Sequence, residues 1–178
     1  MTSSPGPEQL GLSPAEIAKV RTLAEQGNTE AQLHLGIMYA TGRGVPQDAA
    51  EAARWYRLGA DQGHARAQWS LGLMYDKGEA VPQDYAEAAR WYRLAADQGD
   101  GLAMTGLGVM YATGAGVPQD YVQAQMWLNL AASRLTGEAR EDAVGFRDRV
   151  AGLMNPAQIA EAQRLAREWD VAHPREPP

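Results

Sequence analysis

Apolar residues recur at helical spacing along most of this chain. Between residues 29 and 41 the inward-facing positions lie four, three and four residues apart, and they are Ala31, Leu35, Met38 and Gly42. This spacing places them on one face of a helix. A second helix is predicted to begin at Asp48 and to end near Gly63, since glycine is common just after a helix. Together the two segments predict a helical hairpin.

The hairpin pattern repeats every 36 residues. Residues 31–66 and 67–102 are identical at 24 of 36 positions without a gap, and the match to residues 103–138 fades after Met126. A repeated helical unit of this length predicts a solenoid in which each unit packs on a near-copy of itself. The landmarks that recur in register are Leu35-Gly36, Leu71-Gly72 and Leu107-Gly108, then Val45–Asp48, Val81–Asp84 and Val117–Asp120.

Residues that recur at every unit are assigned structural roles. The aspartates that precede the second helices, with Glu or Gln three residues later, predict N-terminal capping boxes. The recurring tryptophans are predicted to fill the core. A glycine inside a helix costs about 1 kcal/mol relative to alanine, so the recurring helical glycines indicate close approach of a neighbouring helix. These residues are Asp48, Asp84 and Asp120; Trp55, Trp91 and Trp127; and Gly36, Gly72 and Gly108.

The pattern predicts one all-α domain, an α-solenoid of about nine helices over residues 13–172. A capping helix at 13–28 precedes repeats at 29–63, 64–99 and 100–135, and two closing helices with apolar stripes occupy 136–172. Ser13-Pro14 and Asn155-Pro156 are typical helix starts. Residues 1–12 and 173–178 are expected to be disordered tails.

Composition narrows the chemistry. Cysteine is absent from the 178 residues and only three histidines are present, so we predict no metal site, no cofactor and no cysteine nucleophile. The net charge is −6 and the chain has no basic run, which argues against nucleic acid as a partner. No apolar run reaches the roughly 18 residues of a membrane span. As given, the chain is expected to be cytoplasmic, or periplasmic or secreted if a signal peptide was removed.

The recurring motif resembles the Sel1-like repeat, a variant of the tetratricopeptide family. It reads Ala-x-x-x-Leu-Gly-x-Met-Tyr, Gly-x-Gly-Val-Pro-Gln-Asp and Ala-x-x-Trp-x-x-x-Ala-Ala, and it occurs at 31–60, 67–96 and 103–132. The second unit has Glu79-Ala80 where its neighbours end in glycine, and a small loop change is expected there. The resemblance implies a right-handed α-solenoid whose first helices line a concave surface. It also implies a non-enzymatic adaptor or scaffold that holds a partner protein or peptide.

Positions that differ between the units are candidates for binding. On the first helices they share one face, next to the repeated face. We expect this variable face to line the concave groove of a monomeric protein. Trp69 is the strongest candidate, because it replaces Leu33 and Thr105 and because tryptophan is enriched in binding hot spots. The predicted partner-binding residues are Glu30, Leu33, His34, Thr41, Arg66, Trp69, Ser70, Lys77, Leu102 and Thr105.

Other interpretations remain open. Variation on this face is also what packing or drift would produce, and an exposed solenoid edge would allow self-association. The alternative function is a hydrolase of β-lactam or cell-wall compounds, as suggested for cysteine-rich relatives. Its nucleophile would be Ser70, which shares a helical face with His34 and Lys77. The lack of cysteine weakens this analogy, so we predict that the protein is not an enzyme.

Overall fold

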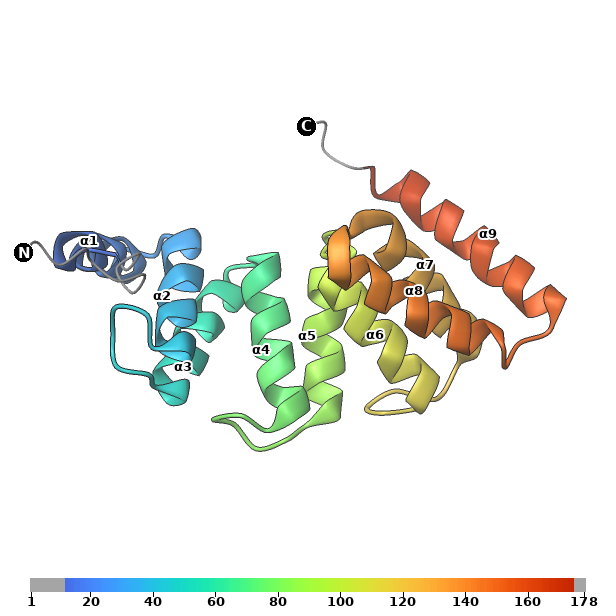
Figure 1. Ribbon diagram of the computed structural model, residues 1–178, viewed down its shortest axis with the longest axis horizontal. Helices are drawn as coiled ribbons and strands as arrows, with labels where there is room; N and C mark the ends of the chain where they lie inside the picture. Colours follow the sequence, from blue (N-terminus) through green and yellow to red (C-terminus); the bar gives the residue numbers. More distant parts are fainter. Residues whose placement is uncertain (1–11, 175–178) are drawn as a thin grey trace, which may run out of the picture.

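The computed structural model describes residues 12–174, and within them the chain forms nine α-helices and no strand (Figure 1). The expected tails at 1–12 and 173–178 lie outside the described residues, except for Leu12, His173 and Pro174. The helices are α1 (Pro14–Glu25), α2 (Thr29–Thr41), α3 (Ala49–Asp61), α4 (Ala65–Lys77), α5 (Tyr85–Asp97), α6 (Gly101–Thr113), α7 (Tyr121–Arg134), α8 (Gly137–Ala151) and α9 (Pro156–Ala172).

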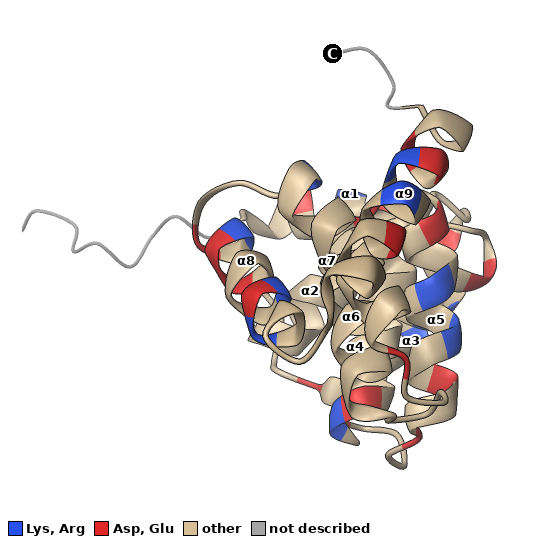
Figure 2. Cartoon of the chain, turned by 90° about the vertical axis from the view of Figure 1, so that its right-hand side faces the viewer, with Lys and Arg blue, Asp and Glu red and all other residues tan. Residues whose placement is uncertain are grey.

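The helices pack as hairpins that succeed one another along the long axis of the molecule (Figure 1). Helices α2 and α3, α4 and α5, and α6 and α7 form the three hairpins, and α1 packs on α2. Viewed along the array, α2, α4 and α6 form one layer, with α3 and α5 on one side of it and α8 on the other (Figure 2). The predicted all-α solenoid is confirmed.

The recurring tryptophans and aspartates have the structural roles predicted for them. Trp55, Trp91 and Trp127 are 5%, 3% and 1% exposed and belong to the core. Each capping aspartate accepts hydrogen bonds from two backbone amides of the helix that it starts, at 2.9 and 3.0 Å, and these residues are Asp48, Asp84 and Asp120.

The full capping boxes predicted at these aspartates are wrong. The glutamate three residues later turns to an arginine instead, as Glu51 does to Arg54 at 3.2 Å. An arginine one turn further along gives the carboxylate a charged partner, which the backbone amide does not. Among the described helices, the reciprocal bonds of a box form at Ser13 and Asn155.

The recurring glycines mark the contact between the two helices of each hairpin. A Cβ atom on Gly72 would lie 2.8 Å from Cδ1 of the Tyr92 ring, closer than real Cβ contacts. A Cβ on Gly36 would lie 2.5 Å from the Tyr56 ring, and a Cβ on Gly108 would lie 2.7 Å from the Leu128 side chain. The predicted close approach is therefore confirmed, and its partner is the second helix of the same unit.

The loop of the second unit keeps the conformation of its neighbours although its sequence differs. Gly44 and Gly116 have φ angles of +76° and +70°, and Ala80 at the same repeat position has a φ of +60°. A left-handed conformation is costly for an alanine, whose Cβ approaches the backbone. The sequence change is therefore absorbed as strain at one residue, with the turn preserved.

The regular array ends at Leu135. The corresponding Gly63 and Gly99 have φ angles of +89° and +91°, whereas Leu135 is extended with φ −90° and ψ 160°. Chain direction after α7 therefore differs from that after α3 and α5. Helix α8 packs against α7 and α6, and α9 packs against α7.

Candidate functional site

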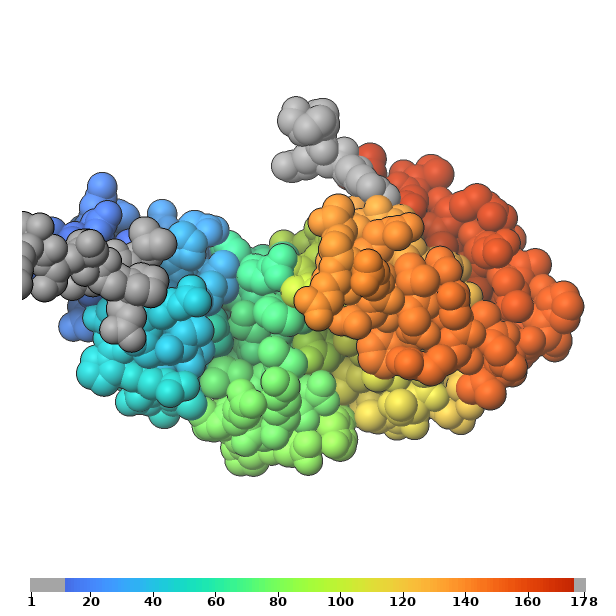
Figure 3. All heavy atoms as spheres, viewed as in Figure 1, coloured from blue at the N-terminus to red at the C-terminus, as the bar shows by residue number. Residues whose placement is uncertain are grey.

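A cavity of about 590 Å³ opens between α4, α6 and α8, and we call it the α8 groove. In the space-filling view, α8 in orange lies over the yellow atoms of α6 and next to α4 in green (Figure 3). The groove is largely apolar, and α8 supplies a wall that the regular repeat lacks. Its lining includes Trp69, Leu73 and Asp76 of α4; Leu102, Thr105, Gly106 and Val109 of α6; and Ala139, Asp142 and Phe146 of α8.

Three of the predicted binding residues meet in this groove. Trp69, Leu102 and Thr105 are all half-buried and line it. The guanidinium of Arg66 lies 5.4 Å from the centre of the Trp69 ring and also bonds Asp100 at 3.2 Å. This stacking restrains the indole at the mouth of the groove. Arg66 and Trp69 therefore lie side by side on α4.

The prediction that Leu33 and Ser70 contact a partner is wrong, because both side chains are buried. Leu33 is 5% exposed and packs between its own hairpin and α4. Ser70 is 7% exposed, and its hydroxyl donates to the carbonyl of Arg66 at 2.9 Å. It also contacts the Tyr56 phenol. The pKa of Tyr56 is raised, because burial raises it more than the contact with Ser70 lowers it. Position 70 therefore faces the second helix of the preceding hairpin and offers no surface to a partner.

The other predicted residues are exposed but lie away from the groove. The His34 imidazole lies 3.2 Å from Glu30, which also contacts His64 at 2.9 Å. The hydroxyl of Thr41 donates to the Ile37 carbonyl at 2.7 Å. The ammonium group of Lys77 lies 3.8 Å from Glu79. The variable face is therefore spread along the array, and its α4 and α6 parts line the α8 groove.

The residues proposed for hydrolysis each have a partner elsewhere. The hydroxyl of Ser70 is bonded to a backbone carbonyl, His34 is paired with Glu30, and Lys77 is paired with Glu79. A nucleophile needs a base within hydrogen-bond reach, and this arrangement does not supply one to Ser70. Residues 12–174 contain no cluster of three His, Cys, Asp or Glu side chains suited to a metal ion.

Sequence reasoning missed the contribution of α8 and of Tyr92. The Tyr92 phenol donates to Asp76 at 3.4 Å, and its pKa is raised, first by burial and then by the Asp76 charge. A Cβ on Gly106 would lie 2.9 Å from this ring. Gly106 stands where the earlier units have His34 and Ser70, so this replacement was a signal that a neighbouring side chain packs closely against α6 at this position.

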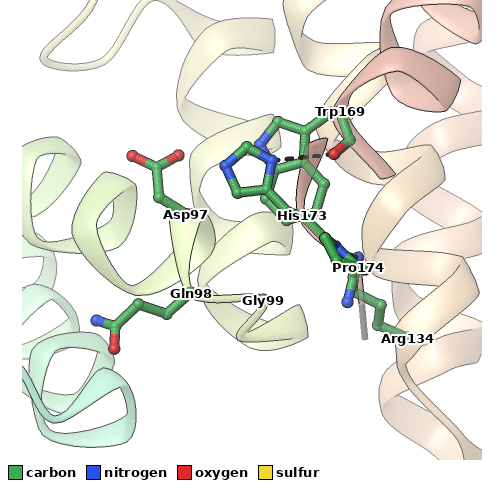
Figure 4. Close-up of a pocket in the computed structure, with 7 residues that line it drawn as sticks. All are labelled: Asp97, Gln98, Gly99, Arg134, Trp169, His173 and Pro174. Atoms are coloured by element: carbon green, nitrogen blue, oxygen red, sulfur yellow. Dashed lines mark hydrogen bonds between the residues drawn. The ribbon is translucent and has the colours of Figure 1, made fainter. Parts of the chain in front are cut away.

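A second cavity, of about 650 Å³, lies between the ends of α5, α7 and α9 (Figure 4). Arg134, whose side chain is 10% exposed, bonds Asp170 at 2.6 Å and lies 4.9 Å from the Trp169 ring centre. The His173 ring stacks on Trp169 with centres 4.1 Å apart. Arg134 is therefore committed to holding α9 on the array, and the variable face of the first helices does not reach this cavity.

The stacked hairpins and the groove on their first-helix side define a helical repeat protein of the solenoid class. The sequence model of the Sel1 repeat matches residues 29–64, 65–100 and 101–134. The chain therefore belongs to the Sel1 repeat family, as its motif indicated.

Solved structures agree with this assignment. A Sel1 repeat protein from Oxalobacter formigenes is 35% identical, with a TM-score of 0.64 over 72% of this chain and 97% of that one. The protein c5321, a protective antigen of uropathogenic Escherichia coli strains with an SLR fold, is 27% identical, with a TM-score of 0.66. That match covers 90% of this chain but 42% of c5321, so this chain spans less than half of its length. No curated protein matches the sequence.

No helix between residues 12 and 174 combines the length and the apolar character that crossing a bilayer requires.

Proposed function

We propose that this protein is a non-enzymatic interaction module that holds a segment of a partner protein in the α8 groove. Sel1 repeat proteins generally act as protein-interaction modules. The observation that supports the groove as the binding place is Trp69, a half-buried aromatic at a position that the fold does not reserve for one.

The groove has the features of a peptide-binding surface. Its walls come from four helices, α4, α5, α6 and α8, so its shape is largely formed before a partner arrives, which lowers the entropic cost of binding. Aromatic and aliphatic side chains supply buried contact area, and Thr105 and two carboxylates supply polar contacts at the edges. Binding energy in such interfaces is concentrated in a few aromatic or arginine anchors, which here points to Trp69.

Selection from a random phage-displayed peptide library on the purified protein tests this proposal. Recovered peptides are expected to bind Trp69→Ala about tenfold or more weakly, because truncating a central tryptophan commonly costs about 2 kcal/mol or more. The matched control is Leu58→Ala, which truncates an exposed apolar side chain of α3 outside the groove.

Thermal unfolding followed by circular dichroism shows whether each variant is folded. Peptides that bind wild type and the Trp69→Ala variant equally would place the binding site elsewhere. If the Trp69→Ala variant does not fold, Thr105→Trp serves instead, since it fills the groove and is expected to block the same peptides.

A further inference from the structure

The α8 groove continues past Phe146 into a third, smaller cavity, which is distinct from the cavity beside α9. This cavity of about 250 Å³ lies between α6, α7 and α8. It shares Val109, Thr113 and Phe146 with the larger one, so the two are adjoining parts of one channel along α8. Its far side is formed by Leu128, Val150 and Leu153, of which Leu153 is 64% exposed. Two apolar compartments therefore flank one phenyl ring.

Charge is distributed unevenly along this channel. The larger compartment is lined by two carboxylates, Asp76 on α4 and Asp142 on α8, and no basic residue is among its described lining residues. Arg66, which stacks on Trp69 at the mouth, is paired with Asp100 at 3.2 Å. The side chain of Asp76 accepts one long hydrogen bond from Tyr92, and Asp142 makes no hydrogen bond or ion pair within residues 12–174. The smaller compartment contains Arg149, which stacks on Phe146 at 4.5 Å.

The repeat does not require either carboxylate, although Asp76 accepts the hydrogen bond of the buried Tyr92 phenol. Asp76 stands where the first and third units have Ala40 and Ala112, so the repeat does not require a carboxylate there. Asp142 belongs to α8, outside the repeats. Carboxylates on facing walls of an apolar groove, without a basic side chain among them, attract a cationic group and disfavour an anionic one.

We propose that the occupant of the channel is a peptide segment with apolar side chains on both sides of Phe146 and a lysine or arginine directed at Asp76 and Asp142. This inference rests on the proposed function and adds the chemistry of the partner to it. The apolar side chains supply contact area in the two compartments. The cation fixes the direction of the segment, because it fits the compartment that the two carboxylates line and not the compartment that contains Arg149.

The peptides recovered by selection on the purified protein test this inference. They are expected to be enriched in lysine or arginine next to leucine or aromatic residues, relative to the starting library. Binding of a fluorescein-labelled recovered peptide to Asp76→Asn/Asp142→Asn is expected to be about tenfold weaker, since a cation pairs with a carboxylate and not with an amide. Replacement of the basic residue in the peptide by norleucine should give the same loss and little further loss in the double variant.

The matched control is Asp61→Asn, which removes an exposed carboxylate at the end of α3 and should leave affinity unchanged. Raised salt should weaken wild-type binding more than binding to the double variant. Peptides that require Trp69 but show no basic enrichment, or bind the double variant equally, would overturn this inference and leave the proposed function intact. If no peptide depends on Trp69, both are wrong.

Discussion

The second and third units share their scaffold and differ in the way the chain leaves them. Both have the capping aspartate, the helical glycine and the buried tryptophan in the same places. The second unit ends at Gly99 with a left-handed turn that leads into the next hairpin, whereas the third ends at the extended Leu135. The repeated residues therefore build a surface, and the departures from the repeat turn it into a groove.

The largest expected effect is on the shared scaffold, through Gly72→Leu. The added Cβ would meet the buried Tyr92 ring at 2.8 Å and the carbonyl of Ala88 at 3.3 Å. Neither neighbour can withdraw without opening the hairpin, so the free energy of unfolding should fall by about 3 kcal/mol or more. Urea unfolding followed by circular dichroism measures it, and an unchanged midpoint would show that the hairpin contact is not what this glycine serves.

A helical glycine outside the repeat provides the control. A Cβ on Gly145 of α8 would meet nothing within 4 Å. Gly145→Ala is therefore expected to raise the free energy of unfolding by about 0.5–1 kcal/mol, because alanine is the better helix former. Opposite signs at the two positions would separate a steric requirement from helix propensity.

A smaller effect is expected where the closing helix is held. Arg134 occupies the repeat position at which the first two units have Gln62 and Gln98. The substitution Arg134→Gln introduces the same residue in the third unit and removes the 2.6 Å bond to Asp170. The loss should be about 1–2 kcal/mol and confined to α9. Hydrogen exchange should accelerate over residues 156–172 and stay unchanged in α2 to α5. Unchanged exchange in α9 would mean that Trp169 packing alone holds this helix.

The smallest effect concerns the loop in which the second unit departs from its neighbours. Ala80→Gly should raise the free energy of unfolding by about 0.5–1 kcal/mol, because it removes an alanine from a φ of +60°. Differential scanning calorimetry measures the change. Ala115→Gly, in the corresponding loop of the third unit but without a positive φ, should lower stability instead. A loss at both positions would indicate that the entropy of the unfolded chain, and not strain at Ala80, decides the effect.

The scaffold could be predicted from the sequence because each residue that the packing requires recurs in all three repeats. Trp55, Trp91 and Trp127 could be assigned to the core since a residue that recurs in every unit serves the packing that recurs. The same comparison could not give the burial of the variable positions. Leu33 is enclosed and Trp69 lines a groove, although they occupy the same position in the repeat.

The placement of α8 was also beyond the sequence. Its apolar stripe, which includes Phe146, shows that one face is buried but not which surface covers it. That surface is decided by the backbone at Leu135, and a leucine is compatible with many directions of the chain. A segment that occurs once offers no second copy for comparison, so both the groove wall and Asp142 became apparent only in three dimensions.

Because the regular array ends at Leu135, the length of the protein and the proposed binding groove depend on different parts of the chain. Insertion of another 36-residue unit between the first and second hairpins would lengthen the molecule and leave α4, α6 and α8 around the groove as they are. Exchange of α8 and α9 for another closing segment that covers α7 would keep the hairpins and replace the wall of the groove. If the proposed function holds, a designer of repeat proteins could change the partner through the C-terminal closing segment and change the length of the protein through the number of repeats.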